Sequence, residues 1–393
     1  MADLGQIEGR LKLVVRISGG TVANVSILST RAVRACSVFH DHSVAEVLRL
    51  IPSVFSICGT AQAHAGLAAC EEALGQSLSA PQYAARRLLL MVETAQEHCW
   101  RIALDWPKLV DKLPDVKALM ALRAPLTGIA AGLFPDGEWL RPGGGRLDVD
   151  IPRLGEAVDT FSHCLTQSLL SGWDSVADVD TLRHWADGVD TTAANLVRRI
   201  MALGLADFGG SFIELMGGAD LEDIGGVLAG DTNGEFVAKP HLEGTVHETG
   251  PLARMRKQQV VASVLERFGN GILARFVARL AELSDISSDM GMVLPRLSDD
   301  EGADFDHGAS GAGVAMVEAA RGLLVHRVEL EKGYVRRYQI LAPTEWNFHP
   351  QGPLVEGLRG SDGHGIRESA AMLITALDPC VAYDMVVEES DDA

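Results

Sequence analysis

Apolar and polar residues alternate along two segments near the start of the chain, 11–17 and 21–28, which flank Gly19-Gly20. A period of two is typical of a β-strand with one buried face, and a Gly-Gly step suits a tight turn. These segments predict a β-hairpin. The same pattern predicts a second hairpin, with strands at 323–331 and 334–341.

Elsewhere apolar residues recur at spacings of three and four, which predicts helices that each bury one face. Prolines and glycines mark several ends, such as Pro52, Gly75 and Pro107. The glycine-rich segment 308–313 follows no strand of a βαβ unit, so we predict a flexible loop and no nucleotide site. The predicted helices lie at about 43–51, 61–74, 81–106, 152–170, 180–205, 251–284 (broken near 269–271) and 366–377.

This pattern predicts a helix-dominated α+β fold with two small β-hairpins, in a single domain over residues 1–393. The formal net charge of −19 argues against nucleic-acid and anionic-membrane partners, because phosphates attract a basic surface. No signal peptide is evident, and every apolar run is shorter than a membrane span requires. We therefore expect a cytoplasmic protein. Residues 388–393 are expected to form a disordered acidic tail.

Six cysteines are scattered along the chain without a CxxC pair, so neither a disulfide framework nor a zinc ribbon is predicted. A lone cysteine inside a helix is usually a small core residue. Cys58 differs because it stands beside Gly59 where a helix is predicted to begin, and helix N-terminal amides favour the thiolate that binds metals. Spacing alone leaves a ligand role and a core role for Cys58 equally open, and Cys380 carries a weaker signal.

Six segments, taken together, resemble motifs of the large subunit of nickel–iron hydrogenases and occur in the order of that family. Arg10 departs from the first motif, where the family has His. The match at 341–348, Leu-Ala-Pro-Thr-Glu-Trp-Asn-Phe, is the most specific. The segments are Ile7-Glu8-Gly9, Ile57-Cys58-Gly59 with His64-Ala65, 248–254, 318–322, 341–348 and Asp378-Pro379-Cys380.

The resemblance implies a large-subunit-like fold and a set of site residues. In the family, two pairs of cysteines hold nickel and an iron that carries cyanide and carbon monoxide. By this resemblance Cys58 and Cys380 are metal ligands, and His64 orients a thiolate. Arg321, Pro343 and Thr344 would surround the cyanides, since a guanidinium and a hydroxyl suit an anionic acceptor. Glu8 matches the carboxylate that gates protons, and we expect it near Cys380 as a hydrogen-bond partner.

The chain departs from the family where the second cysteine of each pair should stand. Ala61 and Tyr383 occupy those positions, and Val386 replaces the last histidine of the C-terminal motif. Neither side chain replaces a bridging thiolate, so nickel and hydrogenase turnover are not expected. This combination is similar to hydrogenase maturation proteins of the HupK type.

That resemblance implies a non-catalytic scaffold that holds an iron with cyanide and carbon monoxide ligands, transiently, between the two cysteines. Its expected partners are the hydrogenase large-subunit precursor and the Hyp-type maturation proteins that deliver the fragment. One alternative is a redox-active subunit with an altered metal centre. Another is a metal-free relative like the hydrogenase-derived subunit of respiratory complex I, against which the retained Cys58 and Cys380 argue.

Overall fold

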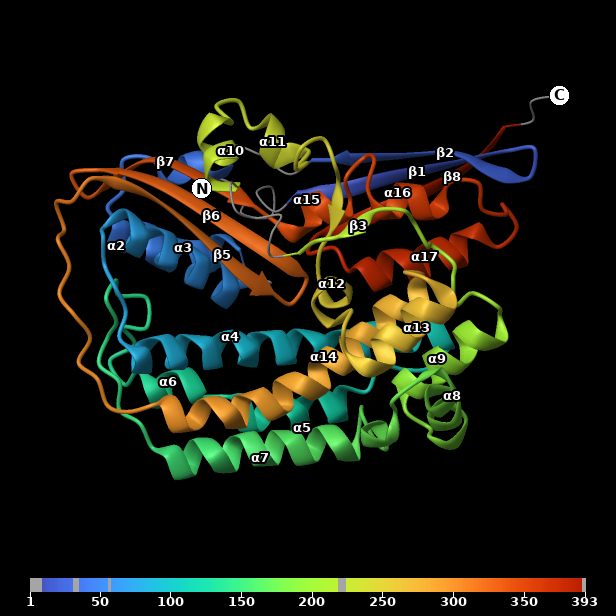
Figure 1. Cartoon of the computed structure of the whole chain (residues 1–393), viewed down its shortest axis with the longest axis horizontal. Helices are drawn as coiled ribbons and strands as arrows, with labels where there is room; N and C mark the ends of the chain where they lie inside the picture. Colours follow the sequence, from blue (N-terminus) through green and yellow to red (C-terminus); the bar gives the residue numbers. More distant parts are fainter. Residues whose placement is uncertain (1–8, 31–34, 56–57, 218–223, 391–393) are drawn as a thin grey trace.

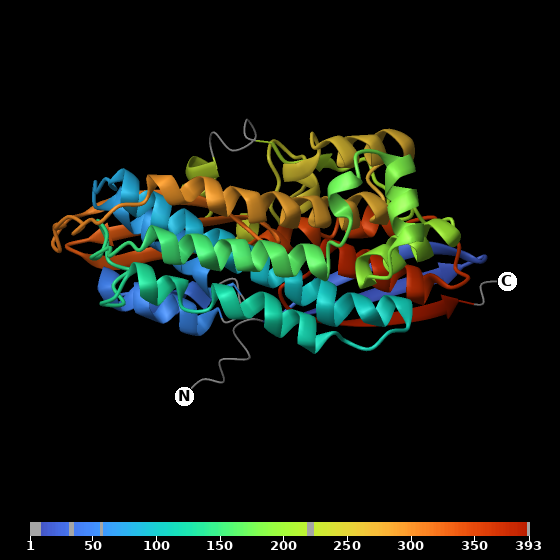
Figure 2. The same ribbon diagram turned by 90° about the horizontal axis from the view of Figure 1, so that it is seen from below.

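The computed structural model describes residues 9–30, 35–55, 58–217 and 224–390. Figure 1 shows two small sheets along one side of an elongated molecule and long helices along the other. Seen from below in Figure 2, those helices run roughly side by side along the length of the molecule.

The predicted N-terminal hairpin is confirmed as β1 (Arg10–Ser18) and β2 (Thr21–Ser29). The structure adds a third strand, β8 (Ala382–Ser390), which pairs parallel with β1 along its whole length. The expected disordered tail is therefore wrong for its first residues. Glu388 and Glu389 belong to β8, and the Arg16 guanidinium lies 2.9 Å from the Glu388 carboxylate. Residues 391–393 lie outside the described part of the chain.

The second predicted hairpin is confirmed as β6 (Gly322–Glu331) and β7 (Tyr334–Leu341), joined on the other side of β6 by β5 (Gly311–Ala319). The prediction of a flexible loop at 308–313 was wrong at its C-terminal end. Gly311 and Gly313 lie in β5, which pairs with β6, and a Cβ on either glycine would meet the backbone of helix α3, at 2.3 and 2.1 Å respectively. These glycines therefore allow the sheet to lie directly on the helix.

Two helices near the N-terminus cover this sheet, α2 (Val44–Val54) and α3 (Gly59–Ala73), and α3 packs against β5 and β6. Below them run two long helices, α4 (Ala80–Trp100) and α14 (Ile272–Val293). Most of α14 is buried, as expected for a helix that is apolar around most of its surface.

The predicted helix at 81–106 ends earlier than expected. After Trp100 the chain forms a π-helical turn (Arg101–Asp105) and a 3-10 turn (Trp106–Val110). Such turns interrupt the regular helical spacing and often occur at functional sites. Here the turn carries Arg101, whose Nε lies 2.9 Å from Asp378.

The predicted helix at 180–205 is two helices, because Thr191 caps a new helix by accepting a hydrogen bond from the amide of Ala194. The last predicted helix agrees with α17 (Ile366–Leu377). The remaining helices and strands are α5 (Val116–Leu126), α6 (Ile129–Leu133), α7 (Ile151–Gln167), α8 (Val179–Gly188), α9 (Thr192–Ala202), β3 (Glu214–Leu215), α10 (Ile224–Gly230), α11 (Glu235–Ala238), β4 (His247–Glu248), α12 (Pro251–Met255), α13 (Gln259–Phe268), α15 (Pro343–Asn347) and α16 (Pro353–Leu358).

Within the described residues, one stretch, Val116–Leu133, is apolar enough to cross a membrane by length and composition, a test that core helices of other proteins also pass. In the structure α5 and α6 divide this stretch, and α5 packs against α7.

Candidate functional site

The fold brings Cys58 and Cys380 to one place, although 322 positions separate them in the sequence. Cys58 is the residue immediately before α3, and Cys380 follows α17 after a turn at Asp378-Pro379. Burial, and after it the nearby Cys380 and Glu93, raise the pKa of the Cys58 thiol to about 12, while Arg321 opposes them. The two sulfurs therefore lie close enough for the charge of one to affect the other.

The carboxylate of Glu93, on α4, holds the start of α3 in place. It accepts hydrogen bonds from the amides of Thr60 at 2.6 Å and Ala61 at 2.8 Å. Burial raises the pKa of Glu93, whereas these two amide donors lower it. Glu93 thus satisfies amide donors that would otherwise be unpaired at the first turn of the helix beside Cys58.

Thr344 lies directly against Cys380. Its Oγ1 is 3.0 Å from the Cys380 sulfur and also accepts a hydrogen bond from the Cys380 amide at 3.4 Å. Either atom can donate in the contact between the hydroxyl and the sulfur. Pro343 begins the short helix α15 that carries Thr344, and both residues are buried.

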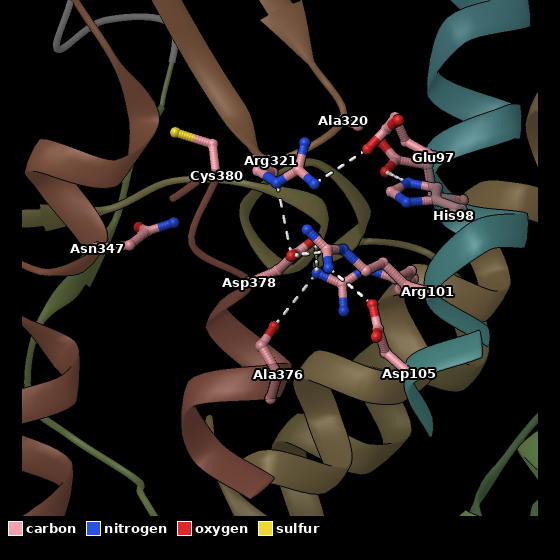
Figure 3. Close-up of polar contacts among 12 residues, drawn as sticks. Glu97, His98, Arg101, Asp105, Ala320, Arg321, Asn347, Ala376, Asp378 and Cys380 are labelled. Carbon is pink, nitrogen blue, oxygen red and sulfur yellow. Dashed lines mark hydrogen bonds and ion pairs between the residues drawn. The ribbon is translucent and has the colours of Figure 1, made fainter. Parts of the chain in front are cut away.

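Arg321 lies in the turn between β5 and β6 and is almost completely buried. Its Nη2 donates to Glu97 at 3.0 Å, and its Nε lies 3.5 Å from Asp378 (Figure 3). Burial alone would lower the pKa of Arg321, but Asp378, Glu97 and the two cysteines outweigh burial and raise it. Within the described residues Nη1 has no hydrogen-bond partner. A buried guanidinium donor is thus left over beside the cysteines.

Asp378 connects Arg321 to the helices behind it. Figure 3 shows its carboxylate between Arg321 and Arg101, and Arg279 lies 3.5 Å from its second oxygen. Burial would raise the pKa of Asp378, but the three guanidinium groups lower it. Because Asp378 is two residues before Cys380, the same carboxylate orients Arg321 and anchors the turn that carries the sulfur.

Thr249, in the segment 248–254, contacts the residues that follow Arg321. Thr249 and Asn347 exchange two hydrogen bonds of 2.9 Å, and the Thr249 hydroxyl accepts from the amide of Leu323 at 2.9 Å. A Cβ on Gly322, whose φ is +133°, would lie 2.6 Å from Thr249. Three of the sequence motifs, 248–254, 318–322 and 341–348, therefore meet around Thr249, and glycine at position 322 leaves room for this contact.

The structure does not show the role expected for His64, which was to orient a thiolate. No hydrogen bond joins His64 to either sulfur in the described part of the chain, and burial followed by Arg86 lowers its pKa to about 4. Gln62 instead donates to the Cys58 sulfur, at 3.7 Å. The expected role of Glu8 lies outside the described residues.

The structure also describes the two positions at which the second cysteine of each pair would be expected. Ala61 is fully buried in the first turn of α3. Tyr383 is half-buried on β8, and burial together with the nearby Asp105 raises its pKa. Among the described residues, no group of three or more His, Cys, Asp or Glu side chains is arranged to hold a metal ion. Within the described residues the site offers two cysteine sulfurs and a set of hydrogen-bond donors.

A metal fragment that brings its own anionic acceptor ligands fits these residues. Two thiolates suit a soft iron centre, and the unpartnered Nη1 of Arg321 and the Thr344 hydroxyl are donors in a dry environment. A cavity of about 440 Å³ opens on the α4 side, and its walls include Thr60, Glu93 and Glu97. These residues contact the start of α3 and Arg321, so the cavity reaches the back of the site.

Sequence reasoning missed Gln62, Glu93, Glu97 and the ion pairs around Asp378. Gln62 stands four residues after Cys58, which is one helical turn, so its position on the same face was available from the sequence. Glu93 and Glu97 lie on another helix, and no local pattern points to them.

A sequence model of the family described as nickel-dependent hydrogenase matches residues 227–382. The hydrogenase expression/formation protein HoxV of Cupriavidus necator is 31% identical, with 87% of each chain covered. HupV of Azotobacter chroococcum, described in the same words, is 30% identical and covers 97% of this chain and 99% of its own. HupK of Bradyrhizobium diazoefficiens is 28% identical over 98% of this chain and 99% of its own.

Among solved structures, the anaerobically purified [NiFeSe]-hydrogenase of Dm. baculatum matches with a TM-score of 0.72 at 16% identity, and covers 96% of this chain and 97% of its own. The Ni-Fe-Se hydrogenase from D. vulgaris Hildenborough matches with a TM-score of 0.69 at 16% identity, covering 93% and 94% respectively. At this identity the likeness shows the fold, and confirms the predicted large-subunit-like architecture.

Proposed function

This chain belongs to the family of hydrogenase expression/formation proteins, and we propose that it serves hydrogenase maturation by holding an iron fragment with cyanide and carbon monoxide ligands. It is an assembly factor and not a hydrogenase, as the descriptions of its relatives indicate. Cys58 and Cys380 supply the thiolates, Arg321 and Thr344 bind the cyanide nitrogens, and Pro343 closes the wall. The scaffold works in the cytoplasm, receives the fragment from Hyp-type maturation proteins and passes it to the hydrogenase large-subunit precursor.

One observation carries this proposal: two cysteines from opposite ends of the chain meet beside a buried arginine with an unpartnered donor, while Ala61 and Tyr383 stand where bridging thiolates would be needed. Two thiolates hold a metal less tightly than four. A carrier must release what it holds, so this reduced ligand set suits transfer better than catalysis.

Infrared spectroscopy tests the proposal directly, because bound cyanide and carbon monoxide absorb where protein is nearly silent. Protein isolated from a host with the cyanide-forming machinery should show these bands, and protein from a host without it should not. Mixing the loaded protein with the large-subunit precursor should move the bands to the precursor. Absence of these bands from protein isolated from the host with the cyanide-forming machinery would overturn the proposal.

A further inference from the structure

A chain of hydrogen bonds runs from the Cys58 sulfur into the β-sheet. Gln62 Nε2 donates to Cys58 at 3.7 Å, and Gln62 Oε1 lies 2.9 Å from Nε2 of His326, on β6. His326 Nδ1 in turn lies 2.8 Å from the hydroxyl of Tyr338, on β7. Gln62, His326 and Tyr338 are all buried, so they form these hydrogen bonds with one another and not with bulk water.

The orientation of the Gln62 amide, with its oxygen toward His326, sets the direction of every bond in this hydrogen-bond chain. An amide oxygen only accepts, so Nε2 of His326 carries the hydrogen. Nδ1 is then the acceptor and the Tyr338 hydroxyl donates to it. Burial lowers the pKa of His326 to about 3, in agreement with a neutral ring. This tautomer is the one that matches a Gln62 amide with its NH₂ group toward the sulfur, whereas the reversed amide would present an oxygen and repel a thiolate.

The helix that carries Cys58 is shaped to reach this chain. Gly66 lies one turn after Gln62 in the middle of α3, where glycine is less favourable than alanine. A Cβ on Gly66 would lie 2.6 Å from the Tyr338 hydroxyl and 3.4 Å from Nδ1 of His326. The glycine therefore lets the helix backbone approach the His326–Tyr338 pair.

We propose that His326 is a positioning residue for Cys58: through its Nε2 hydrogen it orients the Gln62 amide, which stabilises the sulfur as an iron ligand. This inference rests on the proposed function, since it takes Cys58 as a ligand of the fragment. The chain has Ala61 where the family has a second thiolate, and Gln62 supplies the polar contact to Cys58 on this helix. Glu93, Cys380 and Arg321 are the charged or titratable neighbours of Cys58 from the other packed elements.

Nuclear magnetic resonance of the metal-free protein, labelled with ¹⁵N-histidine, tests the tautomer without reference to iron. The signal that disappears in His326→Gln belongs to His326. It should show a hydrogen on Nε2 and none on Nδ1 at neutral pH. A hydrogen on Nδ1, or on both nitrogens, would overturn the inference whatever the protein carries.

The loaded protein tests the consequence for Cys58. His326→Leu and Gln62→Met should each shift the cyanide bands and shorten the half-time of fragment loss about two- to tenfold, the range of one net hydrogen bond. His326→Gln keeps a donor near the Nε2 position and should restore most of the half-time. His349→Leu removes another buried imidazole, one that takes no part in these hydrogen bonds, and is the matched control.

Equal half-times in His326→Leu and the unmodified protein would overturn the inference, as would a His326→Gln variant as impaired as His326→Leu. Absence of bands in the unmodified protein would instead refute the proposed function, and the histidine spectrum would still decide the tautomer.

Discussion

The Thr344 hydroxyl lies 3.0 Å from the Cys380 sulfur and accepts a hydrogen bond from the Cys380 amide. One side chain thus holds the main chain and the sulfur of the same cysteine, from a helix that begins at Pro343. The hydroxyl is therefore a positioning group for Cys380.

Thr344→Val keeps the shape of this side chain and removes the hydroxyl. We expect iron-fragment occupancy to fall about fivefold, because one hydrogen bond contributes about 1 kcal/mol, and the cyanide bands to shift. Infrared intensity per protein measures both effects. Thr375→Val, which removes a hydroxyl bonded within α17 to the carbonyl of Ala371, should leave the bands in place.

Cys58→Ser and Cys380→Ser should each remove most of the cyanide and carbon monoxide signal, since a neutral hydroxyl is a poor ligand for a soft iron centre. Cys164→Ser, at a half-buried cysteine on α7, is the matched control and should keep the full signal. Bands that persist in the double Cys58/Cys380 variant would place the iron elsewhere.

Nickel should not be bound stoichiometrically, because Ala61 and Tyr383 leave only two cysteines where a nickel–iron centre would need four. Elemental analysis of the purified protein should give far less than one nickel per chain. About one nickel per chain, together with hydrogen-dependent reduction of a dye, would favour a redox-active subunit instead.

Gly66→Ala should destabilise the protein by about 1–3 kcal/mol, because the new methyl group overlaps the Tyr338 hydroxyl and Ile51. Gly155→Ala, in the middle of α7, meets only Leu294 at 3.9 Å and should instead stabilise it by about 0.5–1 kcal/mol. Urea unfolding of the two variants measures both free energies. Equal effects at the two positions would contradict the close packing at Gly66.

Stability should fall as the pH drops below about 6.5. Burial lowers the pKa of His326 to about 3 and that of His64 to about 4, from an ordinary value of 6.5. The unfolded imidazoles take up protons first, so acid favours the unfolded state by at most about 1.4 kcal/mol per pH unit for each histidine. The free energy of unfolding, measured with urea between pH 7 and pH 5, should change less steeply with pH in His326→Gln than in the unmodified protein. An equal pH dependence in the two proteins would contradict a neutral buried ring.

Much of the fold could be predicted from local patterns. The two hairpins and the helix α17 were confirmed because alternation, spacing and glycine turns report local backbone structure. The order of the motifs indicated that Cys58 and Cys380 form one site, and the family resemblance named Arg321 and Thr344 beside them. These predictions used residue types and order alone.

Tertiary structure decided what surrounds those residues. The acidic C-terminal residues became a strand because β1 offered an unpaired edge. Residues 311–313 became part of a strand because they pair with β6, and glycine there leaves room for α3. Gln62 rather than His64 contacts the sulfur because the helix turns every 3.6 residues and only one of them faces Cys58. Asp378 and Glu97 orient Arg321 across elements far apart in sequence. A sequence pattern describes one element at a time, and buried charges are paired only when several elements pack together.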